Sequence, residues 1–225
     1  MLSLFLRFQT CMKKHFSFSL LLVIITGIAQ AQFSIFGGPQ STSAKYSIQN
    51  AGQSTTQKQG FIAGVGLTTL IEGPLYFFPS LYYSKKGYEV TFNPPAYLPD
   101  SARAKNNNTS IHTIALSPLF QLNFTKSRNH LFFRFGPAMD FAISGREMFD
   151  STNNKRIERD MKFDFANYSF ATISGNLHLG FQHKSGFTLF AFYEHGLTSL
   201  NNSDGGPTIL HRILGASVGW KIGKR

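Results

Sequence analysis

The chain has 225 residues, enough for one large domain or two small ones, and its 22 Lys and Arg against 11 Asp and Glu give a formal charge of +11. Only 15% of the residues are charged, whereas 24 Phe, 8 Tyr and 20 Gly are present, an aromatic content that excludes a disordered chain. The mean hydropathy of −0.09 excludes a polytopic helical membrane protein. The single cysteine, Cys11, excludes a disulfide scaffold and a cysteine-ligated zinc site.

Residues 1–31 have the organisation of a secretory signal peptide. From Met12 a basic start precedes an apolar stretch over residues 16–29, and the small-residue exit Ala29-Gln30-Ala31 follows. The apolar stretch is shorter than the roughly 20 residues that a spanning helix needs. We predict that residues 1–31 direct export, that Met12 is the true start, and that residues 32–225 form the exported domain. An N-terminal membrane anchor is the alternative interpretation.

Beyond residue 31 the sequence alternates apolar with small or polar residues, the period-two pattern of β-strands. Eight such segments follow in chain order: 33–39, 59–71, 75–92, 109–124, 131–144, 166–183, 187–199 and 209–222. The clearest is 109–124, in which Leu116 and Phe120 share one face while Ser117 and Gln121 share the other. Leu119 is the one large apolar residue on the polar face.

The connections between these segments alternate in length. Those at 40–58, 93–108, 145–165 and 200–208 are long and hydrophilic, whereas those after the second, fourth and sixth segments are tight. An even number of strands with short turns at one end and long loops at the other is typical of outer-membrane barrels. Because hydrocarbon cannot hydrogen-bond a free sheet edge, a membrane sheet must close on itself.

The sequence therefore predicts an all-β fold, an eight-stranded antiparallel up-and-down transmembrane β-barrel of small size. The alternative is a soluble barrel or sandwich, in which the apolar face would point inward. The abundance of bulky aromatic residues on the apolar face and of Gly, Ser, Thr and Asn on the other favours the membrane barrel. The interior of so narrow a barrel is filled by side chains, so a general porin is excluded.

Several stretches carry a family resemblance. Leu75 to Val90 contains Ser80-Leu-Tyr-Tyr-Ser-Lys-Lys-Gly87, and the segments around Ser117-Pro-Leu119, Phe135-Gly-Pro137 and Tyr193-Glu-His-Gly-Leu-Thr198 follow in order. Together they resemble the PorT-like outer-membrane β-barrel family of Bacteroidota, although Ser80 stands where that pattern usually has Glu. The resemblance implies an eight-stranded barrel in the outer membrane. It also implies a link to protein secretion, the role of the founding member.

Polar side chains at inward positions are the first candidate site. We expect them to form a polar network in the lumen, because charges away from bulk water are costly when alone. Arg134 and Asp140 are too far apart along one strand to pair, so each must find a partner on a neighbouring strand. The candidate lumen residues are Ser80, Tyr82, Arg134, Asp140, Asn176, His178, Glu194 and His211.

The charged loop at 145–165 is the second candidate site, because nearly half of the acidic residues lie there beside an equal number of basic ones. A solvated hairpin above the membrane is one interpretation, and a docking surface for a partner is the other. The candidate surface residues are Arg146, Glu147, Asp150, Lys155, Arg156, Glu158, Arg159 and Asp160.

The remaining motifs argue against a catalytic site and against a metal site. Leu197 stands where a lipid-modifying esterase would place its serine two residues after His195, and only His195 and His211 could form a cross-strand metal pair. We predict a non-enzymatic structural or interaction component of the cell envelope, without cofactor or metal. Because the basic residues are dispersed, the expected partners are outer-membrane lipids, lipopolysaccharide and envelope or secretion proteins, and not nucleic acid. A small-ligand or lipid-binding barrel is the alternative, and a lipid-modifying enzyme comes third.

Overall fold

The computed structural model describes residues 32–99 and 102–222, so the predicted signal peptide lies outside the described residues and its role stays a prediction. Within these two ranges no helix is long and apolar enough to span a bilayer. Eight long strands are present: β1 (Gln32–Ile48), β4 (Lys58–Glu72), β5 (Leu75–Tyr97), β6 (Arg103–Asn123), β7 (His130–Asp150), β9 (Ala171–Gln182), β10 (Phe187–Gly196) and β11 (Thr208–Ile222). Three short strands accompany them: β2 (Ala51–Gly52), β3 (Ser54–Thr56) and β8 (Arg156–Asp160).

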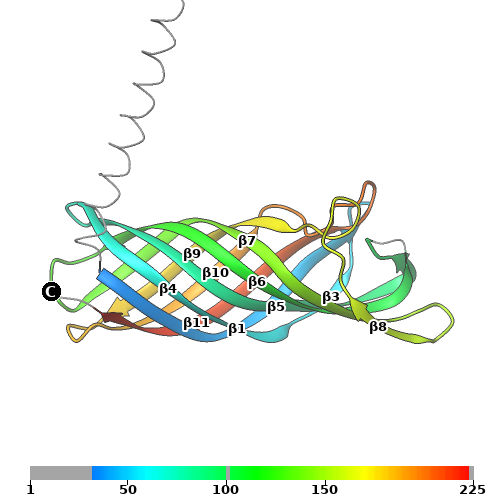
Figure 1. The fold of residues 1–225 in the computed structure, drawn as a ribbon, viewed down its shortest axis with the longest axis horizontal. Helices are drawn as coiled ribbons and strands as arrows, with labels where there is room; N and C mark the ends of the chain where they lie inside the picture. The colour runs from blue at the N-terminus through cyan, green and yellow to red at the C-terminus, as the bar shows by residue number, and fades with distance from the viewer. Residues whose placement is uncertain (1–31, 100–101, 223–225) are drawn as a thin grey trace, which may run out of the picture.

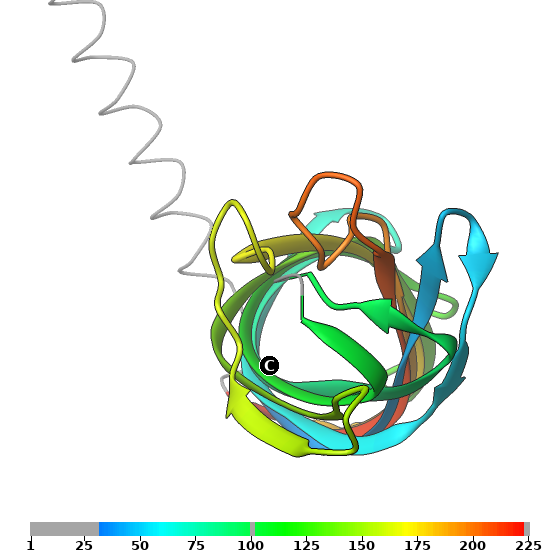
Figure 2. The same cartoon turned by 90° about the vertical axis from the view of Figure 1, so that its right-hand side faces the viewer.

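The eight long strands form a closed antiparallel ring. Each pairs with the next along the chain, and β1 also pairs with β11, from Phe33 opposite Ile222 to Ser47 opposite Thr208. Seen along its long axis, the ring is complete, with β8 and the loops at its rim (Figure 2). The fold class predicted from the sequence, an eight-stranded up-and-down barrel, is confirmed.

The connections differ at the two ends of the barrel. The links between β4 and β5, β6 and β7, and β9 and β10 are short, and they lie at the end where the described chain finishes (Figure 1). We call this the tight-turn end. At the opposite loop end, the links between β1 and β4, β7 and β9, and β10 and β11 are longer, whereas the link between β5 and β6 is short. The short strands β2, β3 and β8 lie in two of the longer links. The predicted alternation of short and long connections holds for three of the four loop-end links. The predicted long loop at 93–108 is wrong, because β5 and β6 extend through most of it.

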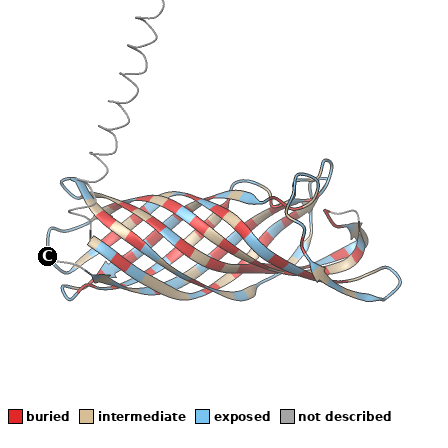
Figure 3. Ribbon diagram, in the orientation of Figure 1, coloured by how far each residue is buried: buried red, intermediate tan, exposed pale blue. Residues whose placement is uncertain are grey.

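Outward-facing side chains form an apolar belt around the tight-turn part of the barrel. Buried and exposed residues alternate along each strand (Figure 3). On β5 the belt runs from Leu75 to Tyr83, roughly 26 Å along the strand and about 20 Å across a bilayer at a 40° tilt. Large apolar side chains exposed on this surface include Phe33, Ile35, Val65, Leu81, Leu116, Phe135, Met139, Leu177, Leu179, Leu189, Val218 and Trp220. This face is exposed, so the soluble-sandwich alternative does not describe the tight-turn part of the barrel.

The polarity of the two faces inverts toward the loop end. On β5 the outward positions beyond Tyr83 include Lys85, Glu89 and Thr91, whereas the inward positions include Tyr88, Val90 and Phe92. These inward residues belong to a buried apolar cluster that we call the upper cluster, with Tyr46, Ile111, Phe149, Tyr168 and Ile209 among its members. An apolar interior with a polar exterior is how a water-soluble barrel is built, so this part of the wall stands above the belt.

The inversion explains where the predicted strand ends were wrong. β1 continues to Ile48, and β5, β6 and β7 extend into the stretches that the sequence analysis assigned to loops at 93–108 and 145–165. Conversely, β9 begins only at Ala171. The short strands β2, β3 and β8 were not expected, because they lie in hydrophilic connections that carry no apolar face.

Aromatic rings fill the belt part of the lumen together with glycines. Phe132, Phe190, Phe192 and Tyr82 belong to a second buried cluster, which we call the lower cluster. A Cβ at Gly180 would lie 2.4 Å from the Phe132 ring, and one at Gly215 would lie 2.3 Å from that of Phe192. These glycines therefore make room for rings. The interior is more aromatic than the sequence analysis expected.

The belt generates the first prediction. Arginine at Leu177, midway along the belt part of β9, should cost about 2–4 kcal/mol of the free energy of unfolding, whereas arginine at Leu131, beside the tight turn, should cost about 0–1 kcal/mol. Trp220, the only tryptophan, is exposed on the belt and reports unfolding by its fluorescence in urea titrations of vesicle-inserted protein. Equal losses at the two leucines would contradict a bilayer around this belt.

Candidate functional site: the sealed lumen and the outer hairpin

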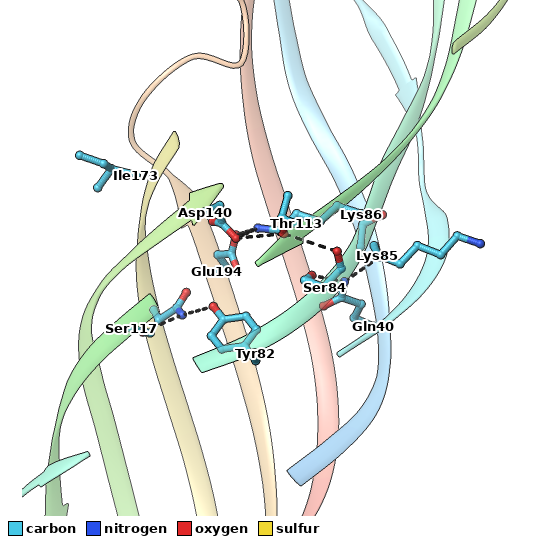
Figure 4. A network of polar contacts seen from close by, with 12 residues as sticks. Gln40, Tyr82, Ser84, Lys85, Lys86, Thr113, Ser117, Asp140, Ile173 and Glu194 are labelled. Atoms are coloured by element: carbon cyan, nitrogen blue, oxygen red, sulfur yellow. Dashed lines mark hydrogen bonds and ion pairs between the residues drawn. The ribbon is translucent and has the colours of Figure 1, made fainter. Parts of the chain in front are cut away.

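An ion cluster crosses the lumen where the belt ends. The Lys86 Nζ lies 2.7 Å from a carboxylate oxygen of Asp140 and 2.5 Å from one of Glu194, and all three side chains are at most 4% exposed. Figure 4 shows both carboxylates directed at the lysine amine. Lys86 comes from β5, Asp140 from β7 and Glu194 from β10, strands that are not neighbours in the ring. The cluster therefore joins separated parts of the wall.

Neutral side chains extend this polar layer. Thr113 donates to Asp140 at 3.3 Å (Figure 4), and the Asn176 amide donates to the Tyr82 hydroxyl at 3.1 Å. The Gln40 amide donates to the Ser84 hydroxyl at 2.9 Å. Because buried ions need hydrogen-bond partners beyond one another, these neutral groups support the cluster.

Arg134 is held by a different set of contacts. Its Nε donates to the Gln121 amide oxygen on β6 at 2.7 Å, and its guanidinium lies 3.6 Å from the ring centre of Phe78 and 4.3 Å from that of Phe132. Ring faces stabilise a desolvated cation. Arg134 therefore has its partner on the neighbouring strand β6, whereas Asp140 accepts a hydrogen bond from Thr113 of β6 but forms its ion pair with Lys86 of the non-adjacent β5.

All eight candidate lumen residues are buried, but they do not form one network. Asp140 and Glu194 meet through Lys86, Tyr82 meets Asn176, and Arg134 stands apart near the tight-turn end. Ser80 donates to the Ser117 carbonyl at 3.3 Å. The His178 ring stacks on Phe190 with centroids 5.2 Å apart, and the His211 ring lies 5.9 Å from that of Tyr88.

Lys86 is the central residue that the sequence analysis missed. Ser80 and Tyr82 were assigned to the inward face, and the same period-two phase places Ser84 and Lys86 inward as well. That period-two phase was the signal that could have identified Lys86.

The polar layer lies between the two apolar clusters. Tyr82 of the lower cluster and Tyr88 of the upper cluster flank Lys86 along β5, and Ala138 and Ala142 flank Asp140 along β7. Polar and apolar side chains together fill the lumen at the levels of the two clusters and of the polar layer between them. The arrangement seals the barrel, as expected for eight strands.

The outer hairpin is the second candidate site. We use this name for β8 and the part of β7 at residues 145–150, which pair from Arg146 opposite Asp160 to Asp150 opposite Arg156. On its exposed face Arg146 contacts Glu158 at 3.0 Å and Asp160 at 3.7 Å. Lys155 and Arg156 are also exposed, at the bend of the hairpin, and Asp150 accepts a bond from Asn106. This face carries charges of both signs.

Glu147 was predicted to lie on the exposed surface of the 145–165 loop, but it is buried. It is 1% exposed and accepts hydrogen bonds from the Tyr168 hydroxyl at 2.6 Å, from Arg159 at 2.7 Å and from Asn107 at 3.1 Å. Burial, Tyr88 and the nearby Glu147 carboxylate raise the pKa of Tyr168 well above its ordinary value, so its hydroxyl remains a donor. Glu147 thus anchors β8, β6 and the segment before β9 to one another.

A bulge in β7 turns Glu147 inward. Thr113 on β6 lies opposite Ala142, but the preceding His112 lies opposite Ser144, so Ile143 is an extra residue. Inward positions are even-numbered before the bulge and odd-numbered after it. An extra residue reverses which face each later side chain occupies.

The described residues do not form a metal site. They contain no group of three or more His, Cys, Asp and Glu side chains placed to hold a metal ion. His195 lies opposite Arg212 while His211 is buried on the inward face, so these two histidines do not meet. The His195 ring instead pairs with the Tyr193 hydroxyl at 2.9 Å.

Comparison with protein families decides the identity of the fold. The model of the family described as "Outer membrane protein beta-barrel domain" matches residues 15–202. The chain belongs to this family. The protein is thus an outer-membrane β-barrel, and the tight-turn end is its periplasmic end, since outer-membrane barrels have short periplasmic turns and long extracellular loops.

Two solved outer-membrane proteins are similar to this chain at low sequence identity. Ail of Yersinia pestis, in complex with the heparin analogue sucrose octasulfate, is 12% identical over 85% of this chain and 99% of its own, with a TM-score of 0.44. Neisserial surface protein A is 15% identical over 85% and 99%, with a TM-score of 0.43. None of the curated proteins matches this sequence.

The ion cluster generates the second prediction. Lys86→Met leaves two buried carboxylates without their cation, which should cost about 3–5 kcal/mol of unfolding free energy. Adding Asp140→Asn and Glu194→Gln should recover most of that loss, because the remaining groups are neutral. Urea titrations followed by Trp220 fluorescence give both values. A loss below about 1 kcal/mol for Lys86→Met would contradict a stabilising cluster.

The Glu147 anchor generates the third prediction. Hydrogen bonds to a buried carboxylate contribute about 1.5–3 kcal/mol each, so Glu147→Ala should open the outer hairpin and speed tryptic cleavage after Lys155 by at least about tenfold. Glu158→Ala is the control, because it removes only the exposed pair with Arg146, worth about 0.2–1 kcal/mol. Equal cleavage of the two variants would show that Glu147 does not anchor the hairpin.

Proposed function

We propose that the protein is a non-enzymatic, closed barrel that acts as an interaction component of the cell envelope, with the outer hairpin as its docking surface. The observation that carries this proposal is the two-sided hairpin. Its inner face is anchored to the barrel through Glu147, and its outer face presents ordered charges. The PorT-like resemblance makes the protein-secretion machinery the partner class that we propose.

The filled lumen supports docking over the other two functions considered. Two apolar clusters and the ion cluster occupy the interior, which leaves a small-ligand barrel without support at these levels. The pairing of His195 with Tyr193, together with Leu197 in place of a nucleophile, supports a non-enzymatic role over a lipid-modifying enzyme.

The hairpin presents an ordered charged surface. Arg146 lies between Glu158 and Asp160, while the Arg156 guanidinium lies against the Met148 sulfur. A surface whose side chains are already ordered loses less conformational entropy when a partner binds. Mixed charges in register favour a protein partner of complementary pattern, since electrostatic complementarity gives specificity.

Lipopolysaccharide is the second partner class that we propose, at the upper edge of the belt. A cavity of about 360 Å³ is lined there by Lys85, His112, Arg146 and Asp160. The cavity lies above belt residues such as Leu81 and Leu116, the level at which anionic lipid headgroups begin. Basic side chains at this level suit phosphate groups.

The docking proposal generates the fourth prediction. A photo-crosslinking residue at Glu158 should give a discrete protein adduct in living cells, and Arg146→Gln with Arg156→Gln should reduce its yield at least fivefold. The matched control is the same probe at Asp204, an exposed acidic residue in the β10–β11 loop. Adducts of equal yield at both positions, or none at Glu158, would show that the hairpin is not the docking surface.

A further inference from the structure

The periplasmic mouth of the barrel encloses a basic cavity. Its volume is about 430 Å³, within the range typical of small-molecule sites. Basic residues from two tight turns and the ends of β7 and β11 line it, and no Asp or Glu is among its lining residues. The basic lining residues are Arg128, His130, His183, Lys184 and Lys221. Basic residues that are dispersed in the sequence are therefore brought together by the fold.

Within the described chain, no acidic side chain lines this mouth to balance its positive charge. Glu72, beside the β4–β5 turn, is the one acidic residue of the described tight-turn connections and their flanks, and it does not line the cavity. Lys221 donates to the neutral Gln32 amide oxygen at 3.3 Å. Arg134, four residues further into the barrel than His130, adds a cation that is buried. Converging cations without counter-charges create a positive potential that attracts an anion.

Hydrogen bonds hold the two turns in place around the cavity. The Lys184 amide donates to the Asn129 side chain at 2.7 Å, which links the β9–β10 turn to the β6–β7 turn. The Lys221 amide donates to the Gly186 carbonyl at 3.0 Å, which links the same turn to β11. A site whose walls are already ordered binds a ligand at lower entropic cost.

We propose that this mouth binds a phosphate-bearing group from the periplasmic side. Arginine and lysine are the side chains that suit phosphate, and several of them converge without a competing carboxylate. The cavity also reaches the outer surface of the wall, because Leu70 and Ile222 line it and are 58% and 50% exposed. The same phosphate chemistry is supplied by a phospholipid headgroup of the inner leaflet or by a soluble phosphate ester.

The test is calorimetric titration of the full chain in a neutral detergent with dihexanoyl phosphatidylglycerol and with glycerol 3-phosphate. Arg128→Gln, Lys184→Gln and Lys221→Gln together should weaken binding at least tenfold. Lys45→Gln, Arg103→Gln and Lys162→Gln, which remove the same charge at the loop end, should change it less than twofold. The double variant Arg128→Gln with Lys184→Gln, confined to the turns, keeps the test valid if the triple variant fails to fold.

The outcomes separate the two sources of phosphate. Binding of the lipid alone identifies a headgroup site, whereas binding of both compounds with similar affinity identifies a site for soluble phosphate esters. Absence of binding by either compound, or equal weakening in the loop-end control, overturns the proposal. A temperature-dependent gel shift confirms that each variant is folded, since closed barrels resist denaturation by detergent until heated.

Discussion

Pairing of β1 with β11 is the constraint on which the rest of this structure depends. A strand edge inside hydrocarbon leaves backbone donors and acceptors without partners, at a cost of several kcal/mol each, so the sheet must close. Closure with eight strands produces a lumen narrow enough to be filled by side chains. The glycines that accommodate Phe132 and Phe192 and the buried ion cluster are both consequences of packing side chains into that space.

The solvent outside the wall determines which face of each strand is apolar. Within the belt, hydrocarbon surrounds residues such as Leu81 and Leu177, and beyond it the outward positions are polar, as at Lys85 and Glu89. The polarity of the interior is opposite to that of the exterior. Above the belt, where the exterior is polar, the interior contains an apolar cluster of the kind found in soluble barrels. The ion cluster lies at the boundary between these two regimes.

Much of the fold could be predicted from the sequence, because period-two alternation and turn length are local signals. The eight segments and their alternating connections are such signals. The ends of β1, β5, β6 and β7 were not predictable by the same criterion, since their apolar face changes sides above the belt. The inward orientation of Glu147 depends on one extra residue, Ile143, whose effect appears only when β7 is paired with β6. The inward orientation of Lys86 could be predicted from the period-two alternation along β5. Its pairing with Asp140 and Glu194 could not, because these two residues come from strands that are distant in the sequence.

Those distant partners show what backbone hydrogen bonds cannot do. In a barrel the backbone joins each strand only to its neighbours, so the wall alone can flatten without breaking a backbone hydrogen bond. Lys86, Asp140 and Glu194 join β5, β7 and β10, each pair of which is separated by at least one other strand. Side chains that cross the lumen therefore fix the cross-section of the barrel directly below the outer hairpin. Because Glu147 lies on the same strand as Asp140, the hairpin is held by a wall whose shape the ion cluster has already determined.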